Sequence, residues 1–171
     1  WRERGHPICI VTADKDLAQL VGEGDHWWDF SRNRKLNARQ LTEKFGVMPE
    51  QMADFLALTG DPVDNIPGVP GIGPKSAAAL LGHFGDLDNL YRRLDEVPTL
   101  PLRGAKSVHR KLDDHRDAAQ LARRLTGIET AVESALSAPE TTRAEVDIER
   151  LNCLFDELNF GGMLRQRCLR L

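Results

Sequence analysis

The amino-acid sequence predicts an α/β fold that continues into a helical region. The apolar run at residues 7–12 indicates a buried strand of a parallel sheet, and residues 26–30 indicate a second strand. Between them, Asp14 is expected to cap a helix over about 15–21, which gives the strand–helix–strand order typical of α/β proteins. From residue 74 onward the apolar positions follow helical spacing, so the rest of the chain is expected to be helical.

Capping residues and turn formers place the next elements. Asn37 is expected to cap a helix that Gly46 ends, and Pro49 to begin another helix. Residues 60–73 are dense in Gly, Pro and Asp and predict a loop. The apolar face of the helix before this loop consists of Met52, Phe55, Leu56 and Thr59.

Helical spacing and caps also place the elements after the loop. Helices are expected over about 74–84 and 86–94, then 104–113 and 116–126, with a linker at 98–101. A polar, Pro-containing segment near 134–144 separates these from a final helical pair, which Asp147 begins and which covers about 148–158 and 161–169.

The composition is that of an ordinary globular protein and argues against a membrane span and a thiolate zinc site. The chain has 171 residues, 41% hydrophobic and 29% charged, and no apolar run approaches the roughly 18 residues that a membrane span needs. Cys9, Cys153 and Cys168 form no CxxC pair, which favours a reducing compartment and argues against a thiolate zinc site. Cys9 is expected to be a small core residue.

Charge is unevenly distributed along the chain. Residues 68–124 contain 10 basic and 7 acidic residues, whereas residues 1–67 contain 8 and 11, and residues 125–171 contain 5 and 8. Acidic groups for metals beside basic groups for phosphates would give this pattern, and so would a random scatter of solvated charges.

Two pairs of aspartates are candidates for a metal site. Asp14 and Asp16 follow the first strand, at the strand end where ligands collect in open α/β sheets. Asp61 and Asp64 lie in the loop, and four neighbouring carboxylates would repel one another unless a divalent cation such as Mg²⁺ were bound. The alternative is structural, because Asp is also common at helix caps and in turns.

The glycine-rich run at residues 68–73 is a candidate phosphate grip. Gly71 and Gly73 permit close backbone approach, and Pro74 suits the first position of a helix. The free N–H groups of Lys75, Ser76 and Ala77 would then point at an anion. Hairpin carbonyls can also hold a monovalent cation. The alternative is a tight helix–helix turn that binds no ligand.

A stripe of basic residues and two tryptophans are further candidates for contacts with nucleic acid. Arg103, Lys106 and Arg110 share one helix face and could follow a phosphate backbone, although an ordinary solvated face would look the same. Trp27 and Trp28 face opposite ways on a strand, and core packing is favoured over base stacking. None of the five histidines has ligand spacing.

Several segments, in order, resemble the 5′-nuclease family, which includes the 5′→3′ exonuclease domain of bacterial DNA polymerase I and its stand-alone relatives. Residues 10–21 read Ile-Val-Thr-Ala-Asp-Lys-Asp-Leu-Ala-Gln-Leu-Val, and residues 54–61 read Asp-Phe-Leu-Ala-Leu-Thr-Gly-Asp. Residues 64–73 read Asp-Asn-Ile-Pro-Gly-Val-Pro-Gly-Ile-Gly. Residues 103–106, Arg-Gly-Ala-Lys, and the closing segment 154–160 add to the resemblance, which covers almost the whole chain.

The resemblance implies a fold and a set of site residues. Residues 1–62 would be the C-terminal part of a PIN-like, resolvase-like α/β nuclease core, and residues 63–171 a helical DNA-binding subdomain with a helix–three-turn–helix at about 64–84. The implied metal ligands and catalytic residues are Asp14, Asp16, Asp61 and Asp64, which would hold Mg²⁺ or Mn²⁺ for two-metal catalysis. The implied DNA contacts are Gly71, Gly73, Lys75, Ser76, Arg103, Lys106 and Arg110, and Val69 and Ile72 would hold K⁺.

The resemblance also implies an activity and a setting. Relatives hydrolyse DNA at 5′ ends or flaps, so a monomeric, cytoplasmic, bacterial enzyme with no membrane partner is expected. The family places further carboxylates and its helical arch before the point where this chain starts, so the chain is expected to be an N-terminally truncated piece that cleaves poorly. The alternative is a helix–hairpin–helix module that binds DNA without cleaving it.

Overall fold

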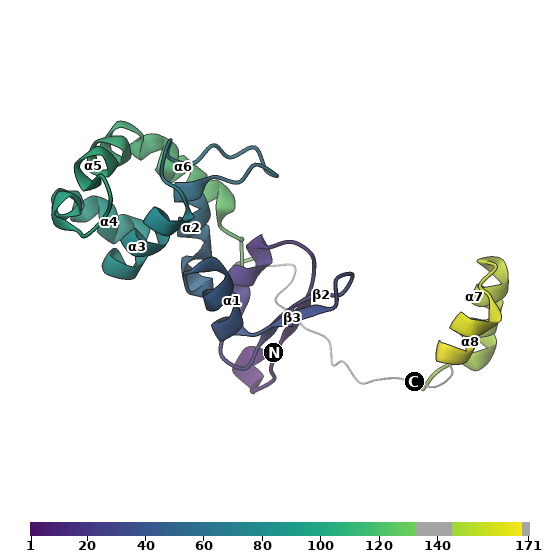
Figure 1. The fold of residues 1–171 in the computed structure, drawn as a ribbon. Helices are drawn as coiled ribbons and strands as arrows, with labels where there is room; N and C mark the ends of the chain where they lie inside the picture. Colours follow the sequence, from purple (N-terminus) through teal and green to yellow (C-terminus); the bar gives the residue numbers. More distant parts are fainter. Residues whose placement is uncertain (133–144, 169–171) are drawn as a thin grey trace. The chain divides into compact units, whose positions relative to one another are not determined.

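The computed structural model describes residues 1–132 and 145–168, which fall into two compact units, Trp1–Glu133 and Ser134–Leu171. In the first unit a small sheet is followed by a group of helices (Figure 1). The predicted mixed α/β architecture with a helical continuation is therefore confirmed. Among the helices that the structure describes, none combines the length and apolarity needed to cross a bilayer.

Three short strands form the sheet, in the order β1-β2-β3. β1 (Cys9–Val11) pairs in parallel with β2 (His26–Asp29), and Ile10 lies opposite Trp27. The connection between them contains a 3₁₀ helix, η2 (Asp16–Leu20), where the sequence predicts an α-helix. β3 (Arg34–Leu36) pairs antiparallel with β2 and is not predicted from the sequence.

The prediction that the first strand is buried is wrong. β1 lies at one edge of the described sheet, Val11 is 59% exposed, and Cys9 is exposed and not a core residue. An apolar sequence is therefore not sufficient for burial, which also needs a neighbouring element to cover the strand. Trp27 on β2 is 3% exposed, so the preference for core packing is confirmed for that residue.

Two helices connect the sheet to the helical group. α1 (Ala38–Phe45) begins at a capping box between Asn37 and Gln40 and ends at Gly46, as the sequence predicts. α2 (Met52–Thr59) follows the 3₁₀ helix η3 (Pro49–Gln51). Met52, Phe55 and Leu56 of the predicted apolar face are buried, and so are the other residues from Met52 to Leu58.

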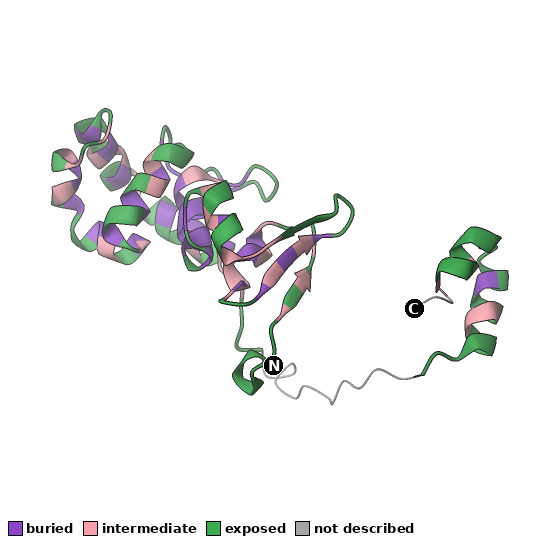
Figure 2. Ribbon diagram, turned by 60° about the horizontal axis from the view of Figure 1, so that its bottom comes forward, coloured by how far each residue is buried: buried purple, intermediate pink, exposed green. Residues whose placement is uncertain are grey.

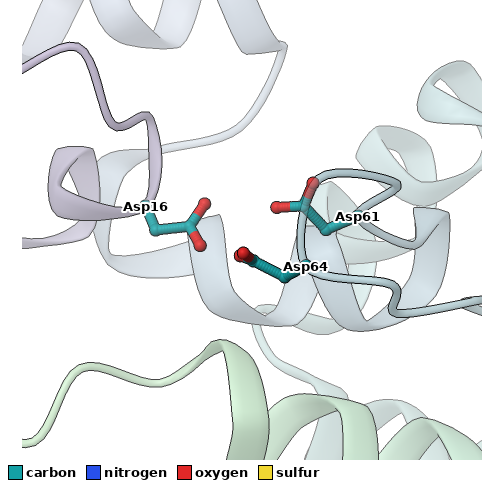
Figure 3. Close-up of side chains that lie close together, drawn as sticks. All are labelled: Asp16, Asp61 and Asp64. Atoms are coloured by element: carbon teal, nitrogen blue, oxygen red, sulfur yellow. The ribbon is translucent and has the colours of Figure 1, made fainter.

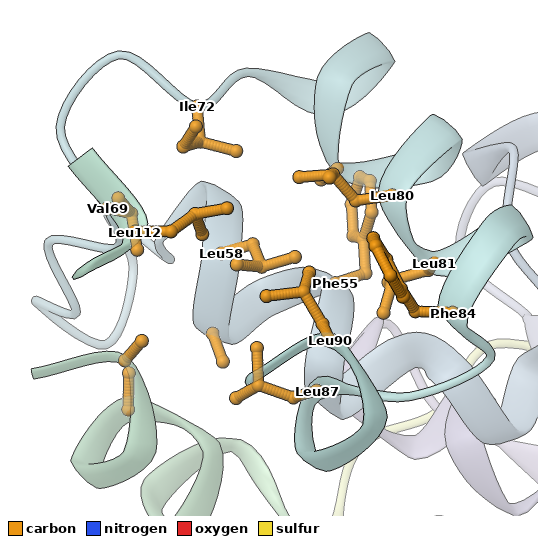
Figure 4. Packing of buried hydrophobic residues seen from close by; sticks show 14 of the residues in the cluster. Phe55, Leu58, Val69, Ile72, Leu80, Leu81, Phe84, Leu87, Leu90 and Leu112 are labelled. Atoms are coloured by element: carbon orange, nitrogen blue, oxygen red, sulfur yellow. The ribbon is translucent and has the colours of Figure 1, made fainter. Parts of the chain in front are cut away.

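The remaining helices of this unit contribute buried residues to one main core that also contains residues of α2 (Figure 4). α3 (Pro74–Phe84) is followed by α4 (Leu87–Arg92) and by the 3₁₀ helix η4 (Leu94–Thr99), which replaces part of the predicted linker. α5 (Ala105–Asp114) and α6 (Arg116–Thr126) complete the group. α2 belongs to this core although it precedes residue 62. The domain boundary expected between residues 62 and 63 stays a prediction.

A smaller core lies between the sheet and α1, and it contains Ala18, Val21, Trp27 and Leu41. In the second unit, α7 (Ile148–Glu157) and α8 (Gly162–Cys168) are mostly exposed (Figure 2). Asp147 caps α7 by accepting a hydrogen bond from the Arg150 N–H, as predicted. The polar segment near 134–144 lies outside the described residues.

Candidate metal centre and nucleic-acid interface

The turn after β1 presents Asp16. The Asp14 N–H donates to Thr12 Oγ1 at 3.0 Å, and the Asp16 N–H donates to Asp14 Oδ1 at 2.9 Å. The Trp27 indole N–H donates to the Asp14 carbonyl at 2.8 Å, which ties the turn to β2. The exposed Asp14 carboxylate therefore shapes the turn, and Asp16 is the buried member of the pair.

A tight hairpin after α2 presents Asp61 and Asp64. The backbones of Asp61 and Ile66 exchange two hydrogen bonds of 2.8 Å, and Asn65 at the turn has a φ of 57°. Asp61 Oδ1 also accepts a hydrogen bond from the Val63 N–H at 3.1 Å. Asp61 is completely buried, whereas Asp64 is exposed.

Three of the four predicted aspartates converge. Carboxylate oxygens of Asp16, Asp61 and Asp64 lie within 4.8 Å of one another, and the three side chains point toward a common centre (Figure 3). Asp14 is not a member of this group, which we call the acidic cluster. One of its oxygens is already used by the Asp16 N–H, which is why it stays in the turn.

Lys15 is a member of the site that the sequence reasoning missed. Its ammonium forms an ion pair with Asp61 Oδ2 and lies 3.5 Å from Asp16 Oδ1. Burial lowers the pKa of Lys15, but the hydrogen bond to Asp61 and the charges of both aspartates outweigh it and raise the pKa above its ordinary value. Its position between two aspartates in the sequence was the available signal.

The pKa of Asp16 is raised above its ordinary range. Burial is the largest cause, Lys15 opposes it, and the negative charges of Asp14, Asp61 and Asp64 add to it. Asp16 Oδ1 is also buried and accepts no hydrogen bond in the described structure. Such an atom needs a positive partner, and carboxylate oxygens are the ligands preferred by hard cations. The donor set of the acidic cluster therefore fits Mg²⁺ or Mn²⁺.

Gln19 connects the acidic cluster to the helical group. Its side-chain amide donates to the carbonyls of Asp16, at 2.9 Å, and Thr126, at 3.0 Å. Its side-chain oxygen accepts from the Ile128 N–H at 3.0 Å. Thr126 in turn donates from Oγ1 to the Ala53 carbonyl on α2 at 2.9 Å. η2, α6 and α2 are thereby linked, which holds Asp16 beside the hairpin of Asp61.

The glycine-rich hairpin is anchored by two buried side chains, Val69 and Ile72, which are 2% and 4% exposed. The Ile72 N–H donates to the Val69 carbonyl at 3.0 Å, and the Val69 N–H donates to the Leu58 carbonyl at 2.9 Å. Gly71 at the exposed tip has a φ of 77°, a conformation that favours glycine. The hairpin therefore has a fixed backbone with an exposed apex.

α3 begins directly after this hairpin. Gly73 is its N-cap and offers no side-chain cap, so the N–H groups of Lys75 and Ser76 belong to the first turn, which has no intrahelical acceptors. The expectation for Ala77 is wrong, because its N–H donates to the Gly73 carbonyl at 3.0 Å. Lys75 is exposed and Ser76 is half-buried.

Lys111 on α5 adds a positive charge to the hairpin. A Cβ atom built on Gly71 would meet the Lys111 Nζ, so the ammonium lies directly against the hairpin tip. The sequence reasoning missed this residue because Lys111 does not share the spacing of the predicted stripe. Only the fold brings α5 next to residues 69–73.

The basic stripe has the orientation that the sequence predicts. Arg103, Lys106 and Arg110 are exposed, whereas Ala105, Val108 and Leu112 of the same segment are buried. Arg103 lies just before α5, and Lys106 and Arg110 lie on it. These side chains are therefore available to an anionic partner.

Comparisons with known proteins found similar sequences and a similar solved structure. Residues 47–149 match the family described as 5′-3′ exonuclease, C-terminal SAM fold. The chain is 45% identical over 92% of its length to a DNA polymerase I from Pseudomonas aeruginosa, of which it covers 17%. It is 34% identical over 93% of its length to a 5′-3′ exonuclease from Buchnera aphidicola, of which it covers 55%. The chain thus spans at most about half the length of these relatives.

A solved structure shares the fold. It is a bacteriophage T5 flap endonuclease in a pseudo-enzyme-product complex with DNA and metal ions, with a TM-score of 0.57 and 23% sequence identity. The similarity covers 69% of this chain and 42% of the bacteriophage protein.

Proposed function

The chain belongs to the 5′-3′ exonuclease family, and from this we propose that it is the metal-binding and DNA-holding part of an enzyme that hydrolyses DNA phosphodiesters at 5′ ends or flaps. The observation that carries the proposal is the acidic cluster, in which three carboxylates from two distant segments share one centre. Like charges gather in this way when a cation offsets their repulsion.

Asp16, Asp61 and Asp64 would hold a divalent cation, which supplies activation of water and stabilisation of the leaving oxygen. The buried Asp61 fixes the position of the site, and the exposed Asp64 leaves it open to substrate. Asp14 orients Asp16 through the turn. This group suffices for one cation, and the second ion of a two-metal reaction would need ligands outside the acidic cluster.

Duplex DNA would be held by the hairpin and by the exposed basic side chains. Gly71, Gly73 and the N–H groups of Lys75 and Ser76 would approach one phosphate, with Lys111 beside them. The carbonyls of Val69 and Ile72 would hold K⁺ between the hairpin and the phosphate. The remaining predicted phosphate contacts are Arg103, Lys106 and Arg110.

The test replaces Asp61 and Asp64 by Asn, with Asp88→Asn as a control that removes one exposed carboxylate from α4. Cleavage of a 5′-flap DNA with Mg²⁺ is measured on the chain extended to the length of its exonuclease relatives, and DNA affinity is measured by fluorescence anisotropy without Mg²⁺. We expect cleavage to fall by about a hundredfold or more, since a metal ion stabilises the transition state by several kcal/mol. DNA affinity should not fall, because replacing a carboxylate by a neutral amide removes repulsion of the phosphates and no attractive contact.

The alternative, a helix–hairpin–helix module that only binds DNA, predicts that neither substitution changes cleavage. The 171-residue chain is assayed in parallel. We expect it to bind DNA but to cleave poorly, and equal cleavage rates for the two lengths would contradict that part of the proposal.

A further inference from the structure

A positive charge already lies among the oxygen atoms that would receive a metal ion. The Lys15 ammonium pairs with Asp61 Oδ2 and lies 3.5 Å from Asp16 Oδ1. That second distance is too long for a good hydrogen bond, and Asp16 Oδ1 accepts none from the described residues. Lys15 therefore forms a close ion pair with Asp61, whereas its interaction with Asp16 is a longer contact without a good hydrogen bond.

The two partners differ in their freedom to move. The Asp61 side chain is completely buried and is fixed by its hairpin, so its charge requires a positive partner in every state of the protein. The Lys15 side chain is 33% exposed and ends a flexible four-carbon stem, so it can leave Asp61 without disturbing the core. A divalent cation bound to Asp61 would repel the ammonium at this distance.

We propose that Lys15 is a tethered counter-ion, which neutralises the acidic cluster in the metal-free protein and leaves Asp61 when a divalent cation binds. This inference rests on the proposed function of the acidic cluster. Metal binding is then an exchange of one cation for another, and the affinity for metal is lower than the three carboxylates would give by themselves.

The exchange is tested by calorimetric titration of the 171-residue chain with Mn²⁺. Lys15→Met is compared with Lys35→Met, which removes the same charge from an exposed position on β3. We expect Lys15→Met to bind Mn²⁺ about tenfold more tightly, equivalent to about 1.4 kcal/mol. The Lys35→Met control should bind within about twofold of the unsubstituted chain. Equal or weaker binding by folded Lys15→Met, checked by circular dichroism, overturns the inference and leaves the proposed function intact.

A measurement on the unsubstituted chain avoids any loss of folding. The acetylation rate of each lysine by acetic anhydride is followed by mass spectrometry, with Lys35 as the internal reference. Saturating Mn²⁺ should raise the rate at Lys15 by about tenfold, the same factor as in the calorimetric comparison, because breaking the ion pair with Asp61 frees the amine for reaction. An unchanged rate overturns the inference.

A different outcome would overturn the proposed function together with the inference. If Asp64→Asn leaves Mn²⁺ binding unchanged, the acidic cluster is not the metal site, and both the proposed function and the inference fail.

Discussion

Gly68 is the residue of the hairpin region that tolerates a side chain least. Its φ is 65°, and a Cβ atom built there would lie 2.6 Å from the Thr59 carbonyl carbon and 2.8 Å from the Gly60 Cα, with the Gly60 nitrogen closer still. All three are backbone atoms at the end of α2, so the rotation of a side chain cannot relieve these contacts. Gly68→Ala must therefore displace the backbone from which the Asp61 hairpin starts.

The magnitude follows from three contributions. Alanine in the left-handed region costs about 1–2 kcal/mol, and forcing a packed segment apart costs about 1–3 kcal/mol more. Alanine also reduces the entropy of the unfolded chain, which returns about 0.4–1 kcal/mol. We therefore expect Gly68→Ala to lower the free energy of unfolding by about 1–5 kcal/mol.

Urea unfolding followed by tryptophan fluorescence measures this loss, because all three tryptophans lie in the first unit. The control is Gly82→Ala, the same chemical change on the exposed face of α3, where a Cβ would meet nothing within 4 Å. The control should gain about 0.5–1 kcal/mol. A Gly68→Ala protein within about 0.5 kcal/mol of the parent would refute the reasoning.

Two further predictions concern buried ionisable groups. Arg123→Ala should lower the free energy of unfolding by about 2 kcal/mol at pH 7, because it leaves the Asp54 carboxylate buried without its 2.5 Å partner. Arg124→Ala, at an exposed neighbour, should change it little, and equal losses in the two variants would contradict the ion-pair explanation. Burial raises the pKa of Tyr91, the single tyrosine, to about 12, with Arg116 opposing. Its stabilising contribution is complete below the unfolded pKa of about 10 and is lost as the pH rises through 12. Tyrosinate absorbance after a rapid pH jump should show this midpoint, and a folded-state midpoint near 10 would show that burial does not control it.

The elements that the sequence predicts well are those whose ends are marked locally. α1 has its cap at Asn37 and its stop at Gly46, and both signals lie within two residues of the helix. β3 escapes prediction because its three residues have no apolar alternation and depend on pairing with β2. The exposure of Cys9 escapes for a related reason, since burial of a strand is decided by what packs beside it.

The residues at the acidic cluster also divide into those that local sequence signals predict and those that depend on distant contacts. Asp16, Asp61 and Asp64 were accessible to prediction because each occupies a turn after a recognisable element. Lys15 was marked only by its position between two aspartates, and Gln19 by no signal, because sequence spacing does not encode the distant contacts of a long side chain. Their partners, Asp61 and Thr126, lie 46 and 107 positions away along the chain.

The acidic cluster depends for its geometry on parts of the fold that carry no charge. Three carboxylates within 4.8 Å of one another oppose folding, and Lys15 offsets only part of that repulsion. The remainder must come from the apolar core around α2, whose C-terminal end leads into the Asp61 hairpin. Gln19 and Thr126 then connect η2 to the same core, so Asp16 cannot withdraw from Asp61 without breaking buried hydrogen bonds. The helical core that would hold DNA is therefore also the part of the fold that keeps the acidic cluster together.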